Sequence, residues 1–80
     1  MKINPFKNIK EEINTPAIEL YGNKRIIVFD CKCVLDYTKD YIILDLGEMN
    51  LKITGENLIA DNFAYGQTDI RGVIKNIEFL

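Results

Sequence analysis

The chain has 80 residues, of which 48% are hydrophobic and 28% charged, with a net charge of −2 and no histidine. This composition is ordinary for one soluble globular domain and excludes an intrinsically disordered chain. The slight acidity gives no support for binding nucleic acid or an anionic membrane surface, since both require basic patches. The apolar runs are too short for a membrane-spanning helix, and residues 1–13 lack the apolar centre of a signal peptide. We therefore expect a cytoplasmic protein with no direct membrane insertion.

Residues 1–15 form a separate segment whose pattern predicts a short N-terminal helix or tail. Asn4-Pro5 suits a helix N-cap followed by the first helical position. Apolar side chains then recur at helical spacing, at Phe6, Ile9 and Ile13. Three alternatives stay open for this segment: packing on the following domain, fraying as a tail, or binding a partner.

Residues 16–80 predict a single β domain, because apolar and polar residues alternate between short turns that contain glycine. The clearest element is a hairpin over residues 41–54, closed by the two-residue turn Gly47-Glu48. This turn places six apolar side chains on one face, as the pairs Leu46–Met49, Leu44–Leu51 and Ile42–Ile53. A second turn of the same type, Gly55-Glu56, predicts a further hairpin. In that hairpin Leu58 would face Ile53, and Ala60 would face Leu51.

We expect about seven short antiparallel strands, spaced at the intervals typical of an all-β sandwich or barrel. Gly72 lies inside the last of them and predicts a bulge or bend. The predicted fold class is thus all-β, a small antiparallel β-sandwich (residues 16–80) that follows a short N-terminal helix or tail (residues 1–15). A β-solenoid is the alternative arrangement, since the Gly-Glu dipeptide recurs eight residues later.

No catalytic set is recognisable in the sequence, so we expect a non-enzymatic protein with no cofactor and no bound metal. The absence of histidine removes the commonest general base and the commonest metal ligand. Cys31-Lys32-Cys33 lacks the other two ligands of a structural zinc site and has the wrong spacing for a redox pair. Turn formation explains Asp61 and Asp69 better than a calcium site does. The alternative is a thiol-dependent redox or metal-responsive protein that uses Cys31 and Cys33.

Several apolar side chains do not fit on the face that the 41–54 hairpin assigns to the core. Twisted sheets and the N-terminal helix could cover them, which is the structural alternative. An exposed apolar patch otherwise marks a site for a partner or a second copy. The predicted partner interface consists of Ile26, Val28, Tyr41, Ile43 and Ile59.

Four segments, taken in order, carry a family resemblance. They are residues 16–23 (PAIELYGN), 34–37 (VLDY), 51–58 (LKITGENL) and 72–79 (GVIKNIEF). Through them residues 14–80 resemble the YabP/YqfC family of small sporulation proteins of endospore-forming bacteria. The opening Pro-x-x-x-Leu-x-Gly-Asn pattern points to the YqfC-like branch. The chain departs from the family pattern at Cys31-Lys32-Cys33 and in the loop at residues 64–67.

The resemblance implies a compact β-sandwich with no established catalytic residues. It further implies a protein made in the mother cell during sporulation, which acts through protein–protein interaction as a binding or assembly module in spore-envelope formation. Such a module would dock onto a membrane-associated sporulation protein at the periphery of the forespore membrane. The other expected mode is self-association into a homo-oligomer.

Overall fold

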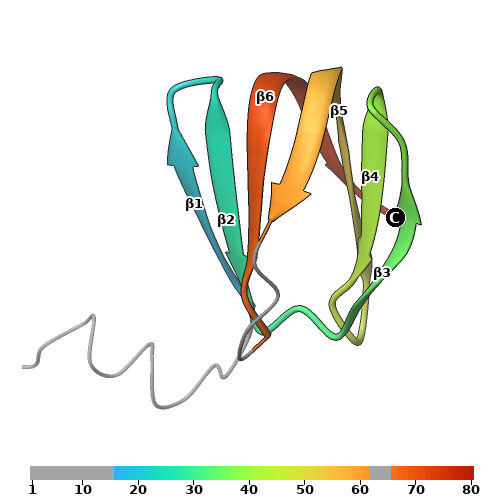
Figure 1. Ribbon diagram of the computed structural model, residues 1–80. Helices are drawn as coiled ribbons and strands as arrows, with labels where there is room; N and C mark the ends of the chain where they lie inside the picture. The colour runs from blue at the N-terminus through green and yellow to red at the C-terminus, as the bar shows by residue number, and fades with distance from the viewer. Residues whose placement is uncertain (1–15, 62–65) are drawn as a thin grey trace, which may run out of the picture.

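The computed structural model describes residues 16–61 and 66–80, which form six β-strands (Figure 1). The helix expected within residues 1–15 therefore lies outside the described residues. The strands are β1 (Ala17–Tyr21), β2 (Arg25–Phe29), β3 (Cys33–Tyr37), β4 (Tyr41–Asp45), β5 (Asn50–Asp61) and β6 (Thr68–Phe79).

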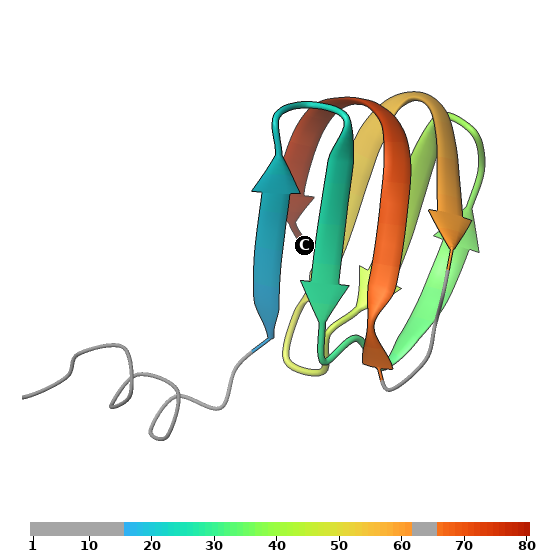
Figure 2. The same ribbon diagram turned by 60° about the vertical axis from the view of Figure 1, so that its left-hand side comes forward.

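All six strands belong to one antiparallel sheet with the order β1-β2-β6-β5-β4-β3. The strands β5 and β6 have 12 residues each, and both arch over so that the two halves of the sheet face each other (Figures 1 and 2). We call β1, β2, the beginning of β6 and the end of β5 the first half-sheet. The second half-sheet consists of β3, β4, the beginning of β5 and the end of β6.

The arch depends on backbone irregularities near the middle of both long strands. The register between β5 and β6 shifts twice in this region, and Asn57 and Gly72 have φ angles of 52° and 140°. A Cβ atom on Gly55 would overlap the backbone carbonyl oxygen of Val73. Glycine is therefore required where the backbones of β5 and β6 approach each other closely at the bend.

A continuous apolar core lies between the two half-sheets. Burial of an aliphatic side chain of this size contributes about 1.5–3 kcal/mol to stability. The side chains of this core come from every strand except the edge strands β1 and β3, and one precedes the Gly47 turn. They are Ile26, Val28, Ile42, Leu44, Leu46, Leu51, Ile53, Leu58, Ile70 and Ile74.

The all-β class and the hairpin over residues 41–54 are confirmed. Ile42 pairs with Ile53 and Leu44 with Leu51, while the Leu46 amide donates to the Met49 carbonyl at 2.9 Å. The sequence alternation sufficed here because a two-residue loop leaves a single register that buries all the apolar side chains on one face.

The hairpin expected at Gly55-Glu56 is wrong. Residues 50–61 form the single strand β5, and Ala60 pairs with Ile70 of β6 rather than with Leu51. The reason is that β6 is long enough to pair with both parts of β5. The backbone groups on either side of Gly55 therefore find partners in β6 without a chain reversal.

The hairpins β1–β2 and β3–β4 correspond position by position, at an offset of 16 residues. Each turn is hydrogen-bonded to the bend of one long strand. Gly72 donates its amide to the Lys24 carbonyl at 3.1 Å, and Gly55 donates to the equivalent carbonyl of Asp40 at 2.9 Å. The sheet is thus built from two similar units, each a hairpin of two five-residue strands tied to a bent 12-residue strand.

Candidate contact surfaces

Two of the predicted interface residues lie in the core. Ile26 and Val28 are fully buried in the apolar cluster between the half-sheets, so their expected place on a contact surface was wrong. Residues alternate between the two faces of a strand, and the residue of β2 that lies between these two, Ile27, points to the outer face. The long core of the arched sheet needs inward side chains from β2 as well as from the 41–54 hairpin.

The other three predicted residues do not form one patch. Tyr41 and Ile43 lie on the outer face of β4 in the second half-sheet, and both are half-buried. Ile59 pairs with Arg71 on the outer face of the first half-sheet and is 55% exposed. The arch of β5 separates these positions, so the structure offers two candidate surfaces in place of one.

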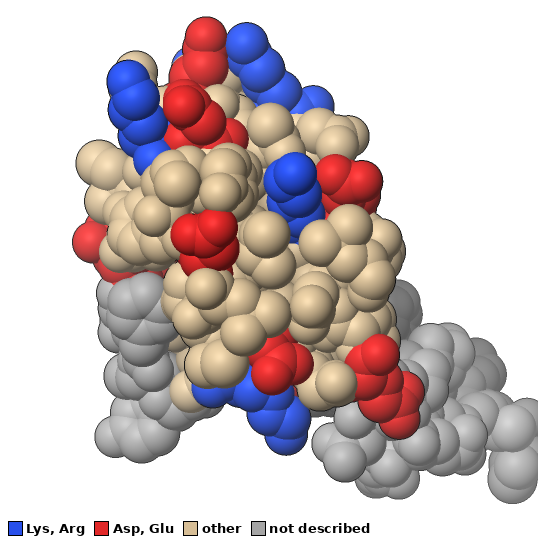
Figure 3. Space-filling model, turned by 90° about the vertical axis from the view of Figure 1, so that its right-hand side faces the viewer, with Lys and Arg blue, Asp and Glu red and all other residues tan. Residues whose placement is uncertain are grey.

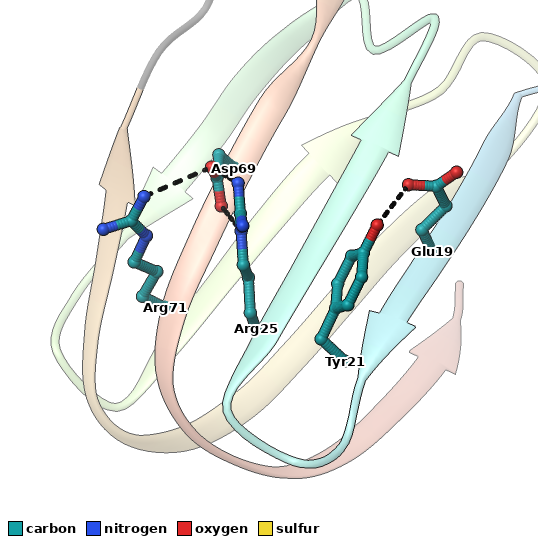
Figure 4. Close-up of polar contacts among 5 residues, drawn as sticks. All are labelled: Glu19, Tyr21, Arg25, Asp69 and Arg71. Atoms are coloured by element: carbon teal, nitrogen blue, oxygen red, sulfur yellow. Dashed lines mark hydrogen bonds and ion pairs between the residues drawn. The ribbon is translucent and has the colours of Figure 1, made fainter.

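The first surface is organised around a buried carboxylate. Asp69 of β6 accepts two hydrogen bonds from Arg25 of β2, from Nε at 3.0 Å and from Nη2 at 2.6 Å (Figure 4). Arg71 brings a second guanidinium to 3.8 Å from the same carboxylate. The sheet register sets this geometry, because Ile27 pairs with Asp69 and Arg25 pairs with Arg71.

These contacts shift the titration of the groups involved. The hydrogen bonds from Arg25 lower the pKa of Asp69 below its ordinary value, against the opposing effect of burial. On the neighbouring strand the Tyr21 hydroxyl donates to Glu19 at 3.0 Å, and this bond raises the pKa of Tyr21. The Arg25 guanidinium also lies 5.6 Å from the centre of the Tyr21 ring. We define the Asp69 face as Glu19, Tyr21, Arg25, Ile59, Asp69 and Arg71.

The second surface centres on Tyr41. Its hydroxyl donates to the Asp36 carboxylate at 2.7 Å, which raises the pKa of Tyr41. The Lys52 ammonium lies 5.3 Å from the centre of the Tyr41 ring. Figure 3, which views the molecule from the side of β3 and β4, shows uncharged surface with charged groups scattered over it. The polar atoms of Tyr41 are thus already occupied within the chain, and Ile43 beside it is half-buried.

The cysteine segment shows ordinary contacts for the ends of strands. Cys31 Sγ lies 3.5 Å from the Cys33 carbonyl oxygen, Cys33 Sγ lies 3.9 Å from the Asp45 carboxylate, and both thiols are free. An open pocket of about 330 Å³ adjoins them, lined by Pro16, Asp30, Cys31, Lys32, Leu46 and Gly66. Over residues 16–61 and 66–80 no group of three or more His, Cys, Asp or Glu side chains could hold a metal ion.

The sequence alone did not reveal the Arg25–Asp69 pair. The two residues are 44 positions apart, and their contact depends on the pairing of β2 with β6. One signal was available: Asp69 lies at the start of the last expected strand, where a carboxylate requires a partner if it is buried.

In comparisons with protein-family models, curated proteins and solved structures, none matched the chain. Within the part of the chain that the structure describes, no helix has the length and apolar character needed to cross a membrane.

Proposed function

We propose that the chain is a non-enzymatic binding and assembly module in spore-envelope formation, and that the Asp69 face is its docking surface. One observation carries the choice of surface. Ile59 and Arg71 are cross-strand partners; Ile59 is 55% exposed, and the Arg71 side chain is 58% exposed. An apolar side chain and a guanidinium thus stand next to each other on a paired part of the sheet.

The chemistry of this surface suits a protein partner. Arg and Tyr are the residue types most enriched at the energetic centres of interfaces. Asp69 holds Arg25 in place through two hydrogen bonds, which reduces the conformational entropy that binding must overcome. Arg71 makes only a long contact with Asp69, so its guanidinium can pair with a carboxylate of the partner, while Ile59 and Tyr21 provide apolar contact.

The family resemblance supports the biological setting. The proposal takes the two half-sheets to be the layers of the β-sandwich that YabP/YqfC-like proteins are expected to have. The partner is then a membrane-associated sporulation protein, and the module acts in the mother cell at the periphery of the forespore membrane. The outer face of β4, with Tyr41 and Ile43, ranks second because its polar groups are bonded within the chain.

A fluorescent fusion of the chain in sporulating cells tests the proposal. The unaltered fusion should collect at the forespore membrane and sediment with the membrane fraction, whereas Ile59→Lys and Arg71→Glu should leave it diffuse in the mother cell. Lys39→Gln, in the exposed β3–β4 turn, serves as the matched control and should localise normally. If the unaltered fusion is diffuse, the proposed function is wrong. If Ile59→Lys localises normally, the function can stand and the Asp69 face is not the docking surface.

A further inference from the structure

At one end of the molecule, the space between the half-sheets is open. Its two rims are β1 and residues 73–79 of β6, which face each other (Figure 2). Leu20 pairs with buried Ile26, and Phe79 pairs with buried Leu51, so both side chains point toward the core side of the sheet. They are nevertheless 54% and 61% exposed, because neither rim covers the other. We call this opening the β1–β6 seam.

The opposite end of the molecule shows what closes such an opening. There the rims are β3 and residues 57–61 of β5, and the Tyr37 hydroxyl accepts a hydrogen bond from the Ala60 amide at 2.9 Å. The Leu58 amide also donates to the Lys39 carbonyl at 2.8 Å. At the β1–β6 seam the residue equivalent to Tyr37 is Tyr21, which points outward and bonds to Glu19. A tyrosine hydroxyl thus bridges the two rims at the β3–β5 end, whereas the equivalent tyrosine at the β1–β6 seam bonds within its own strand.

The β6 rim also presents backbone groups suited to pairing. Leu80 and Asn50 exchange two backbone hydrogen bonds, at 2.8 and 3.2 Å. Because backbone direction alternates along an antiparallel ladder, the amide and carbonyl groups of Ile77 and Phe79 point away from β5. The strand β2 pairs with β6 over residues 68–71, and the β1–β2 turn accepts hydrogen bonds from the Gly72 and Ile74 amides at 3.1 and 2.7 Å. Within the described residues the edge is unpaired beyond Ile74, which in other proteins is a template for strand addition.

We propose that a second copy of this chain occupies the β1–β6 seam, by antiparallel pairing of β6 with β6 of the partner around a two-fold axis at Ile77. In this register Ile77 faces its own copy and Asn76 faces Glu78. Ile77 then meets its copy on the inward side, Asn76 meets Glu78 on the outward side, Lys75 stands opposite Phe79, and no like charges stand opposite each other. A register centred on Glu78 would place two carboxylates face to face, and a shift by one residue would bring inward side chains against outward ones.

The two-fold symmetry of this pairing brings both rims of the seam, β1 and the end of β6, into the contact. A two-fold axis perpendicular to the second half-sheets joins them into one continuous sheet and brings the two β1 edges toward each other across the axis. Leu20 and Phe79 of each copy then lie in the space between the two cores. A second copy is therefore favoured over an unrelated strand, since it supplies a matching apolar residue for each rim and the complementary polar pair Asn76–Glu78.

The pairing specifies the surface for self-association, one of the two docking modes in the proposed function, and it uses no residue of the Asp69 face. Light scattering across a concentration series tests it on the full chain. The expected result is a species of twice the 9.2 kDa chain mass that dissociates on dilution. Phe79→Lys, which places a cation opposite Lys75 of the partner subunit, should raise the dissociation constant by about tenfold or more. Leu35→Lys, at a 52% exposed site on the β3 edge, should leave it unchanged.

Amide hydrogen exchange on the unaltered chain provides a second measurement that does not depend on how a variant folds. The Ile77 amide should exchange more slowly as concentration rises, whereas the Leu35 amide should not respond. A monomer at every concentration would overturn the inference. So would a dimer that survives Phe79→Lys, or one that Ile59→Lys dissociates, which would place self-association on the Asp69 face. A variant that loses membrane localisation but still dimerises would bear on the Asp69 face as the docking surface and would not contradict pairing at the β1–β6 seam.

Discussion

The hairpins β1–β2 and β3–β4 match in strand length, turn position and core residues, yet the registers of their strand pairings differ by one residue. In the first, β1 pairs with β2 without interruption, so Tyr21 lies opposite Arg25 on the outer face. In the second, the β3–β4 register shifts between Val34 and Asp36, so Tyr37 lies opposite buried Ile42. One β-bulge thus moves the same residue type from the outside of the sheet to the core side. That change closes one end of the molecule and leaves the other open.

The two units also differ in the contact that spans their outer faces. Arg25 and Asp69 in the first unit correspond to Tyr41 and Lys52 in the second, because Ile27 pairs with Asp69 and Ile43 pairs with Lys52. An ion pair with a buried carboxylate in one unit therefore takes the place of a cation–π contact in the other. The similar backbone thus holds two chemically unlike surfaces.

The largest expected effect comes from the glycines at the two bends. Gly55→Ala should cost at least about 3 kcal/mol, because its Cβ would overlap backbone that cannot rotate away. Gly72→Ala, whose Cβ would lie 2.8 Å from the Asn57 carbonyl oxygen at a φ of +140°, should cost about 1–3 kcal/mol.

Urea denaturation measures both losses. The control is Gly22→Ala in the β1–β2 turn, where a Cβ meets nothing within 4 Å and the φ of +57° alone should cost about 1–2 kcal/mol. Equal losses of stability in Gly55→Ala and Gly22→Ala would contradict the role assigned to the close approach of β5 and β6 at the bend.

Equivalent core positions should respond alike. Ile26 and Ile42 are 16 residues apart and both fully buried, so Ile26→Ala and Ile42→Ala should each cost about 2–5 kcal/mol. The difference between their free energies of unfolding, obtained from urea titrations, tests the equivalence of the two units. A loss confined to one of them would show that a single unit supports the core.

Acid should distinguish the two outer-face contacts. Because the folded-state pKa of Asp69 is lowered, its contribution to stability is present above the unfolded pKa of about 3.9 and is lost as pH falls through the folded value. Asp69→Asn should reduce stability at neutral pH, by less than Ile26→Ala does, and should flatten the decline in acid.

Thermal melting between neutral pH and pH 2–3 (about one unit below the unfolded pKa) measures this difference. Lys52→Met is the matched change in the second unit. It removes a cation whose contact is with the Tyr41 ring and involves no carboxylate, so the acid decline of this variant should parallel that of the unaltered chain. A parallel decline in Asp69→Asn would show that other carboxylates govern acid unfolding.

The smallest effect concerns the two strand-end tyrosines. Tyr37→Phe removes the acceptor of the Ala60 amide and should cost about 1 kcal/mol. Tyr21→Phe removes only an exposed hydrogen bond to Glu19 and should be close to neutral. Hydrogen exchange at Ala60 should rise in Tyr37→Phe and stay constant in Tyr21→Phe. An unchanged Ala60 amide in both variants would mean that the hydroxyl does not close that end.

The sequence predicted the elements whose cause is local. The period of two and the Gly47-Glu48 turn sufficed for the 41–54 hairpin. The arch could not be predicted in this way, because Gly55-Glu56 has equally good chemistry for a hairpin turn and for a bend. The pairing partner, β6, decides between them, and it lies at the far end of the chain.

The same dependence on distant pairing explains why two of the predicted interface residues were wrong. Ile26 and Val28 were misplaced because alternation shows which residues share a face and does not show which face is covered. The 16-residue correspondence of the two hairpins was visible in the sequence, as Tyr21/Tyr37, Ile26/Ile42 and Ile27/Ile43. It would have placed Ile26 with Ile42 in the core.

The strand order has a consequence for how the chain folds. Four of the five pairings join strands that are neighbours in sequence, and only β2 with β6 joins distant ones, with Val28 and Thr68 as one partner pair. Closing a loop of that length carries the largest entropic cost of any pairing in the sheet, so we expect it to limit the folding rate. During synthesis the first hairpin has no strand to hold it until the last twelve residues of the sheet emerge. The chain therefore becomes a complete domain only when its C-terminal strand is in place.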